Sequence, residues 1–347
     1  MNDQKKKLTA LYELGEFKLI DRLTKNTSLY HKSTVKGIGD DAAVLNYGNQ
    51  YLVLTTDILM EGIHFDLVYT PMKHLGYKAA VINFSDIYAM NASPRQMVVS
   101  IAVSQKFSVE ALDEFYLGLH LACKHYEVDL AGGDTSASIT GMAISITVLG
   151  EVDKERVTLR STAQENDLIC VSGNLGAAYL GLQVLEREKK IFENSKSVQP
   201  NLDEYDYILQ RQLRPEARKD IIEFFNLKNI IPTSMLDISD GLSSELRHIC
   251  AQSDKGCKIY QDKIPMHEQT IETAKEFNME PLICALNGGE DYELLFTASI
   301  DQYELLSSNT DLSIIGYISN KESGCNLVTE LGQEIPLLAQ GWETDPS

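Results

Sequence analysis

The chain has 347 residues, with 31 Lys and Arg against 50 Asp and Glu, so its formal net charge is −19. This acidic balance argues against nucleic acid and anionic membrane surfaces as main partners, although metal ions can offset it for small anionic ligands. With 44% hydrophobic and 23% charged residues, the composition is that of a soluble globular protein, and the length favours two domains.

The first ten residues are polar and lysine-rich, and no apolar run approaches the roughly 20 residues of a membrane span. We therefore expect no secretory signal and a cytoplasmic location. The six cysteines lie far apart and form no C-x-x-C pair. This spacing predicts buried, reduced thiols rather than disulfides or a zinc site.

Helical and strand patterns alternate through the first half of the chain, which predicts an α/β or α+β domain with mixed strand pairing. The expected elements are, in order, a short amphipathic helix over 16–25, a β-hairpin of strands 44–45 and 51–55, a helix over 74–90, a strand over 96–104, a helix over 109–126, and strands 128–131 and 142–148 bracketing a glycine-rich turn.

A polar, charged segment over 153–166 separates the two halves, so we expect one domain over 1–152 and an α+β domain over 153–347. In the second half we expect Pro215 at a helix start and Asp240 as a helix N-cap. The expected elements are a strand over 168–172, a helix over 176–188, a loop over 189–204, a helix over 216–225, and strands 292–297 and 313–318.

Aspartates recur beside glycines or at the ends of apolar runs. Asp41 lies in Gly-Ile-Gly-Asp-Asp, which is not a dinucleotide fingerprint because a strand rather than a helix follows it. Asp57 ends an apolar strand, and Asp86 lies in an apolar helical run, where a buried carboxylate needs a partner or a metal. Asp134 and Asp237 lie in similar acidic, glycine-containing segments. Taken alone, the segments around Asp41 and Asp134 are equally well explained as polar turns, and that around Asp237 can be a helix cap or a turn. Polar turn residues that cap a strand are the favoured explanation for Asp57, whereas a functional role is favoured for Asp86.

These carboxylates would require cations if they gathered in one place. Two unit charges about 4 Å apart at an effective dielectric of about 20 repel by about 4 kcal/mol. Oxygen ligands select Mg²⁺, Mn²⁺ or Ca²⁺, and Mg²⁺ shared between carboxylates and phosphates is the usual nucleotide pattern. The residue pattern by itself does not show that they gather.

Eight motifs in a fixed order resemble the thiamine-monophosphate kinase family, within the aminoimidazole-ribonucleotide-synthetase-like superfamily, over nearly the whole chain. They are Gly-Glu-Phe (15–17), Gly-Ile-Gly-Asp-Asp (37–41), Thr-Thr-Asp (55–57), Gly-Ile-His-Phe (62–65), Asn-Phe-Ser-Asp-Ile-Tyr-Ala-Met (83–90), Gly-Gly-Asp-Thr (132–135), Asp-Ile-Ser-Asp-Gly-Leu (237–242) and Gly-Gly-Glu-Asp-Tyr-Glu-Leu (288–294).

The resemblance implies a two-domain fold whose N-terminal mixed sheet, with its helices, binds ATP and Mg²⁺ and pairs with that of a second copy in a homodimer. The C-terminal α+β domain would complete the active site. The implied reaction is the Mg²⁺-dependent phosphorylation of thiamine phosphate to thiamine diphosphate, with several Mg²⁺ ions and with ATP as co-substrate.

The resemblance also implies roles for individual residues, and Asp57, Asp86 and Arg160 are the expected catalytic ones. The expected metal ligands are Asp41, Thr55, Thr56, Asp57, Asp86, Asp134, Asp237 and Asp240. The expected ATP contacts are Tyr116, Gly133, Asp134, Arg160 and Ser239, and the expected thiamine phosphate contacts are His64, Glu290 and Trp342. Without the resemblance, His64 would be taken for a structural histidine, and Trp342 for a packing anchor.

The acceptor phosphate is already ionised near neutral pH and needs no strong general base. No Ser–His or Cys–His nucleophile pair is evident in the sequence. We therefore expect direct in-line transfer without a phosphoenzyme, driven by positioning and charge neutralisation. Two alternatives stay open at this point, another ATP-dependent synthetase of the superfamily and a non-catalytic dimer that binds Mg²⁺ and nucleotide.

Overall fold

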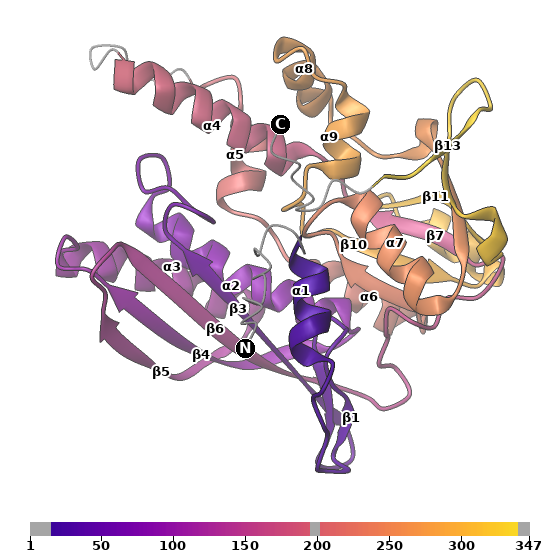
Figure 1. The fold of residues 1–347 in the computed structure, drawn as a ribbon, viewed down its shortest axis with the longest axis horizontal. Coiled ribbons are helices and arrows are strands. Elements are labelled where there is room, and N and C mark those ends of the chain that lie inside the picture. The colour runs from indigo at the N-terminus through magenta and orange to yellow at the C-terminus, as the bar shows by residue number, and fades with distance from the viewer. Residues whose placement is uncertain (1–14, 195–201, 339–347) are drawn as a thin grey trace, which may run out of the picture.

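A computed structural model describes residues 15–194 and 202–338, so Trp342 lies outside the described residues (Figure 1). Two mixed sheets form the framework. The first has six strands in the order β1-β2-β3-β6-β4-β5, and the second has seven in the order β13-β12-β9-β11-β7-β10-β8. No helix in the described part of the chain is long and apolar enough to cross a membrane.

The strands of the first sheet all lie in the N-terminal half and are antiparallel except for the parallel pair β4–β5. They are β1 (Thr34–Lys36), β2 (Ala43–Asn46), β3 (Tyr51–Met60), β4 (Ser93–Val103), β5 (Asp129–Ala137) and β6 (Met142–Val152). The antiparallel β2–β3 pair confirms the predicted hairpin.

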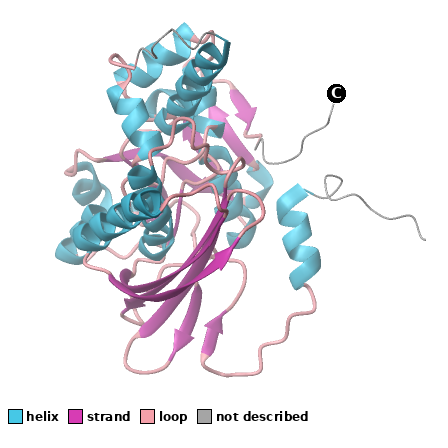
Figure 2. Ribbon diagram, turned by 90° about the vertical axis from the view of Figure 1, so that its left-hand side faces the viewer, coloured by secondary structure: helices cyan, strands magenta, loops and turns pink. Residues whose placement is uncertain are grey.

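Helices α2 (Met72–Ala89) and α3 (Val109–Tyr126) cover one face of this sheet (Figure 2). Gly76 and Gly118 mark their crossing, because a Cβ on Gly118 would lie 1.9 Å from the carbonyl oxygen of Lys73. Helix α2 is buried along most of its length because it also packs against the C-terminal half. Helix α1 (Gly15–Thr24) stands on the other side of the sheet and leaves Leu23 72% exposed.

The second sheet lies in the C-terminal half and is antiparallel except for the pair β9–β12. Its strands are β7 (Leu168–Ser172), β8 (Ser234–Asp237), β9 (Gly256–Tyr260), β10 (Leu294–Ala298), β11 (Leu312–Ser319), β12 (Cys325–Val328) and β13 (Glu334–Pro336). The helices of this half are α4 (Ala177–Asn194), α5 (Asp206–Leu213), α6 (Lys219–Lys228), α7 (Leu242–Ser253), α8 (Glu268–Glu276), α9 (Pro281–Asn287) and α10 (Tyr303–Ser307).

The expected glycine-rich turn is wrong. Gly132, Gly133 and Asp134 lie inside strand β5, and the chain turns later, over 138–141. Parallel pairing with β4 overrides the turn propensity of the glycines. Gly133 is required there because a Cβ would lie 2.0 Å from the carbonyl oxygen of Val99.

Two helix boundaries also differ from expectation. Helix α6 begins at Lys219 and not beside Pro215, because both backbone polar groups of Ala217 bond the hydroxyl of Tyr126 instead. The expected loop over 189–204 is helical as far as Asn194, where α4 ends, and residues 195–201 lie outside the described part.

Asp240 does not cap helix α7 as expected. Gly241 occupies the N-cap position, with a φ of 126°, and no side chain caps the helix. A Cβ on Gly241 would lie 2.8 Å from the carbonyl oxygen of Leu286, so the close approach of that loop requires glycine. The backbone N–H of Asp240 instead donates to the Glu245 carboxylate at 3.0 Å.

Candidate active site

Three aspartates from distant parts of the chain converge between the two halves. Asp41 precedes β2, Asp86 lies in α2, and Asp237 ends β8. Each offers a carboxylate oxygen, and these oxygens all lie within 4.8 Å of one another. The convergence that the sequence pattern left open is therefore present.

The electrostatics of these carboxylates are unfavourable without cations. Burial, followed by the charges of Asp57, Asp237 and Asp41, raises the pKa of Asp86 well above its usual value. Burial and the charge of Asp41 raise the pKa of Asp237 to about 7. Arg160 binds Asp41 through its guanidinium and is the cation in direct contact with it among the described residues. One arginine cannot balance four neighbouring carboxylates, so the cluster is suited to metal ions.

The alternation of strand β3 divides the Thr-Thr-Asp motif between the two faces of the sheet. Thr55 faces α2 and donates a 2.6 Å hydrogen bond to the Asp86 carboxylate. Asp57 follows on the same face, and its backbone N–H donates to the Asn83 side chain at 3.1 Å. Thr56 points the other way and bonds Thr147, so the structure does not bring its side chain to the carboxylate cluster.

Asp134 also lies apart from the cluster. Strand β5 is three strands from β3 in the sheet, a separation of about 14 Å. Asp134 is exposed and pairs in register with Ser100, whose side chain is also exposed. By strand alternation it therefore shares the uncovered face with Thr56.

Tyr116, on helix α3, lies far from the carboxylate cluster. Its neighbour Phe115 packs beside Gly76, which precedes Asp86 by ten residues of α2, or about 15 Å. The ring of Tyr116 contacts Phe115 and His120 of its own helix. The structure therefore does not bring Tyr116 to the carboxylates.

A cavity of about 560 Å³ opens beside the cluster, and two of the expected substrate contacts, His64 and Glu290, line it. Ser239 and Asp240, which follow Asp237 closely in the chain, also line it. His64 accepts a 3.0 Å hydrogen bond from the Met60 backbone, which orients its ring. Glu290 forms a 3.1 Å ion pair with Lys78 and accepts a 2.9 Å hydrogen bond from Gln212.

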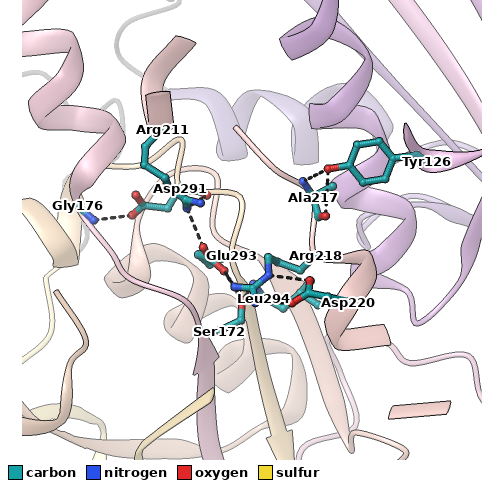
Figure 3. Close-up of polar contacts among 10 residues, drawn as sticks. All are labelled: Tyr126, Ser172, Gly176, Arg211, Ala217, Arg218, Asp220, Asp291, Glu293 and Leu294. Atoms are coloured by element: carbon teal, nitrogen blue, oxygen red, sulfur yellow. Dashed lines mark hydrogen bonds and ion pairs between the residues drawn. The ribbon is translucent and has the colours of Figure 1, made fainter. Parts of the chain in front are cut away.

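The acidic segment 290–293 is held by a network of buried bonds (Figure 3). Asp291 accepts from the Gly176 backbone at 2.8 Å, and burial raises the pKa of Asp291 to about 7. Glu293 pairs with Arg211 at 2.8 Å and with Arg218 at 2.5 Å. These two carboxylates anchor the segment and leave Glu290 to face the cavity.

Backbone hydrogen bonds hold two residues of this segment in unusual conformations. Glu290 and Tyr292 have φ values of 57° and 52°, a region that residues other than glycine seldom occupy. Both are tied to the segment after β8, since the N–H of Glu290 donates to the Ser239 carbonyl at 2.6 Å and that of Tyr292 to the Ile238 carbonyl at 2.9 Å. The carboxylate cluster and the cavity wall are thus joined through the backbone.

Several residues that matter in this geometry were missed in the sequence. Lys78 is buried in α2 and lines the cavity, and its position within an apolar helical run is the same signal that identified Asp86. Asn83 and Ser85 hold Asp57 and Asp237. The roles of Arg211 and Arg218 have no local signature, because their partner Glu293 lies more than 70 residues away in the sequence.

The chain is similar to known proteins over most of its length. The profile of the family described as "AIR synthase related protein, N-terminal domain" matches residues 39–152. Thiamine-monophosphate kinase of Bacillus subtilis (strain 168) is 35% identical over 316 residues, which is 89% of this chain and 92% of the relative. The enzyme of that name from Aquifex aeolicus (strain VF5) is 34% identical over 302 residues, covering 87% of this chain and 92% of the relative.

A solved structure described as AaThiL complexed with AMPPCP and TMP superimposes with a TM-score of 0.82 at 31% identity and covers 97% of this chain and 99% of that chain. The matches in sequence and in fold both extend over most of the chain, and they name the family that the ordered motifs resemble. The chain therefore belongs to the thiamine-monophosphate kinase family of phosphotransferases.

Proposed function

We propose that this chain transfers the γ-phosphoryl group of ATP directly to the phosphate of thiamine monophosphate, giving thiamine diphosphate without a phosphoenzyme. The observation that carries the proposal is the convergence of Asp41, Asp86 and Asp237 within 4.8 Å, beside a cavity of about 560 Å³. The ligands named in the description of the similar AaThiL structure, AMPPCP and TMP, support the choice of ATP and thiamine monophosphate.

The donor set fits Mg²⁺. It is composed of carboxylate and hydroxyl oxygens, and the pKa of Asp86 is raised by neighbouring negative charge that divalent ions would offset. Asp41, Thr55, Asp57, Asp86 and Asp237 would hold ions on the α2 side of the sheet, and Thr56, Asp134 and Asp240 would hold others. Bound Mg²⁺ would neutralise charge that builds on the phosphates during transfer.

The chain's own residues bind and orient the two substrates. Lys78 and Lys189 line the cavity with His64 and Glu290, and they supply positive charge for the phosphate of thiamine monophosphate. The acceptor oxygen is already ionised and needs no base. Trp342, outside the described residues, would stack on the cationic thiazolium ring, an interaction of about 0.5–2 kcal/mol.

Arg160 would change partners during the reaction. Its guanidinium is bound to Asp41 in the structure. Asp41 would hold a cation in the loaded enzyme, and Arg160 would then supply positive charge to the phosphates of ATP. The assignment of Tyr116, Gly133, Asp134 and Ser239 as ATP contacts, and the roles given to the domains 1–152 and 153–347, belong to the same proposal. A cytoplasmic location also stays a prediction from the sequence.

A homodimer is part of the proposal as well. The uncovered face of the first sheet carries Leu54, Ile58, Met60 and Val98, all exposed, and Ile58 is 57% exposed. Apolar side chains grouped on one sheet face favour a protein partner. Ile58→Lys should therefore yield monomers in sedimentation velocity, whereas Tyr47→Lys, in the exposed hairpin turn, should sediment as wild type does.

A coupled assay of ADP release tests the activity. ADP should form only when thiamine monophosphate, ATP and Mg²⁺ are all present. Asp57→Asn should abolish ADP release while the circular dichroism spectrum is unchanged, and Asp113→Asn, an exposed substitution on α3, should retain activity. Binding of Mg-ATP without ADP release would instead identify a non-catalytic nucleotide-binding protein.

The substrate contacts are tested separately. Trp342→Ala should raise the KM for thiamine monophosphate with little change in kcat, because stacking binds the ground state and the transition state alike. An unchanged KM would remove Trp342 from the site.

A further inference from the structure

Three of the six cysteines gather at one point in the C-terminal half, although their wide spacing in the sequence gave no indication of a metal site. Cys250 lies in α7, Cys257 in β9 and Cys325 in β12. Their sulfur atoms all lie within 4.8 Å of one another. Cys257 and Cys325 are directly paired in the parallel ladder of β9 and β12, and α7 places Cys250 over them.

This spacing is close to that of thiolates on a single metal ion. Sulfurs bound at about 2.3 Å to one tetrahedral Zn²⁺ lie about 3.8 Å apart, so a small contraction would complete the arrangement. Sulfur donors select thiophilic cations and discriminate against Mg²⁺, whereas the oxygen donors of the aspartate cluster do the reverse. The two clusters therefore differ in the metal that each would take.

The three thiols differ in their electrostatic surroundings. Hydrogen bonds from Cys250 and Cys257, together with the positive charge of Arg247, lower the pKa of Cys325, whereas the pKa values of the Cys250 and Cys257 thiols are raised. Cys250 and Cys257 are buried, whereas Cys325 is partly exposed and gives the cluster a side open to solvent. Cys170 and Cys284 lie outside this group and are buried in the hydrophobic core.

We propose that Cys250, Cys257 and Cys325 form a binding site for one thiophilic divalent cation such as Zn²⁺ or Cd²⁺. The ion displaces the remaining thiol protons, which pass to solvent, and three thiolates with one divalent ion carry a net charge of −1. Arg247 offsets part of this charge, and water on the exposed side of Cys325 completes the coordination. The site links α7, β9 and β12 and does not depend on the proposed kinase activity.

Cd²⁺ titration of the full-length, reduced protein tests the site. Saturating Mg²⁺ is present throughout, so that oxygen ligands are occupied, and sulfur-to-cadmium charge-transfer absorption is recorded. Wild type should bind about one equivalent with this absorption. Cys250→Ser and Cys325→Ser should lose it, and Cys284→Ser, which changes a buried thiol outside the cluster, should retain it. Circular dichroism verifies that each variant is folded.

Cys325→Ser decides the test if Cys250→Ser fails to fold, because the Cys325 side chain is partly exposed. Zn²⁺ should also raise the Tm of wild type and of Cys284→Ser but not that of Cys325→Ser. The proposal is overturned if wild type lacks the absorption or if Cys325→Ser retains it.

Discussion

The Ser85 hydroxyl donates a 2.5 Å hydrogen bond to the carboxylate of Asp237, across 152 residues of sequence. Ser85 lies in α2 beneath the first sheet, and Asp237 ends strand β8 of the second. The bond is buried, and the residue after Ser85 is Asp86. The position at which the two halves of the chain pack together therefore also brings the carboxylates of Asp86 and Asp237 into one cluster.

Asp86→Asn should separate metal binding from folding. Removing one of several repelling charges should raise the free energy of unfolding of the metal-free protein by about 1–3 kcal/mol, because Asp57, Asp237 and Asp41 all act against this charge. The same variant should lose ADP release and most of the stabilisation that Mg²⁺ gives wild type. Thermal denaturation with and without Mg²⁺ measures the stability of the metal-free protein and the stabilisation by Mg²⁺, and the coupled assay measures ADP release. A variant less stable than wild type in the absence of metal would contradict the repulsion argument.

Glu293→Gln should be strongly destabilising. Glu293 pairs with Arg211 and Arg218 (Figure 3). All three side chains are largely buried. Neutralising the carboxylate leaves two arginines without their common counter-charge, at a cost of about 3–5 kcal/mol in urea unfolding. Asp220→Asn is the matched control, because Asp220 pairs with Arg218 at an exposed position and should cost less than about 1 kcal/mol.

Asp291 should make stability depend on pH. Burial raises the pKa of Asp291 from 3.8 to about 7, so between those values the folded protein holds a proton that the unfolded chain has released. Stability should therefore fall as pH rises through this window, by about 1 kcal/mol per pH unit, and level off above it. Urea unfolding at several pH values should give a flatter profile for Asp291→Asn. Parallel profiles for the two proteins would be inconsistent with a raised pKa.

Gly118→Ala tests the packing of α2 against α3. The added Cβ would lie 1.9 Å from the Lys73 carbonyl oxygen, so the two helices must move apart. We expect a loss of about 1–3 kcal/mol, despite the better helix propensity of alanine. Gly48→Ala, where no heavy atom of the residues that the structure describes lies within 4 Å of the new Cβ, should change stability little. Equal unfolding midpoints for the two variants would show that the crossing tolerates the methyl group.

Much of the secondary structure follows from local patterns. The helix expected over 109–126 and the strand expected over 168–172 have those boundaries in the structure. Hydrophobic patterns predicted both elements, because the helix buries one face and the strand is buried along its whole length. The motif series likewise identified the family, since it depends only on residue order.

Other features depended on packing between distant segments. Gly132 and Gly133 suggest a turn, but pairing with β4 makes them part of a strand. The buried partners of Glu293 and the neighbours of Cys325 have no local signature, because they come from other elements. Local propensity cannot predict contacts between distant segments, because these contacts form only when the chain folds and the sheets pack.

The aspartates also combine a property set by local sequence with one set by long-range packing. The sequence by itself determined which side chains could bind hard cations, because an acidic residue in an apolar run or glycine-rich loop is chemically distinctive. Only the tertiary structure decided that Asp41, Asp86 and Asp237 meet and that Thr56 and Asp134 lie on the opposite face. The reason is physical, since mutual repulsion opposes such a cluster and the packing of α2 against β8 holds it together.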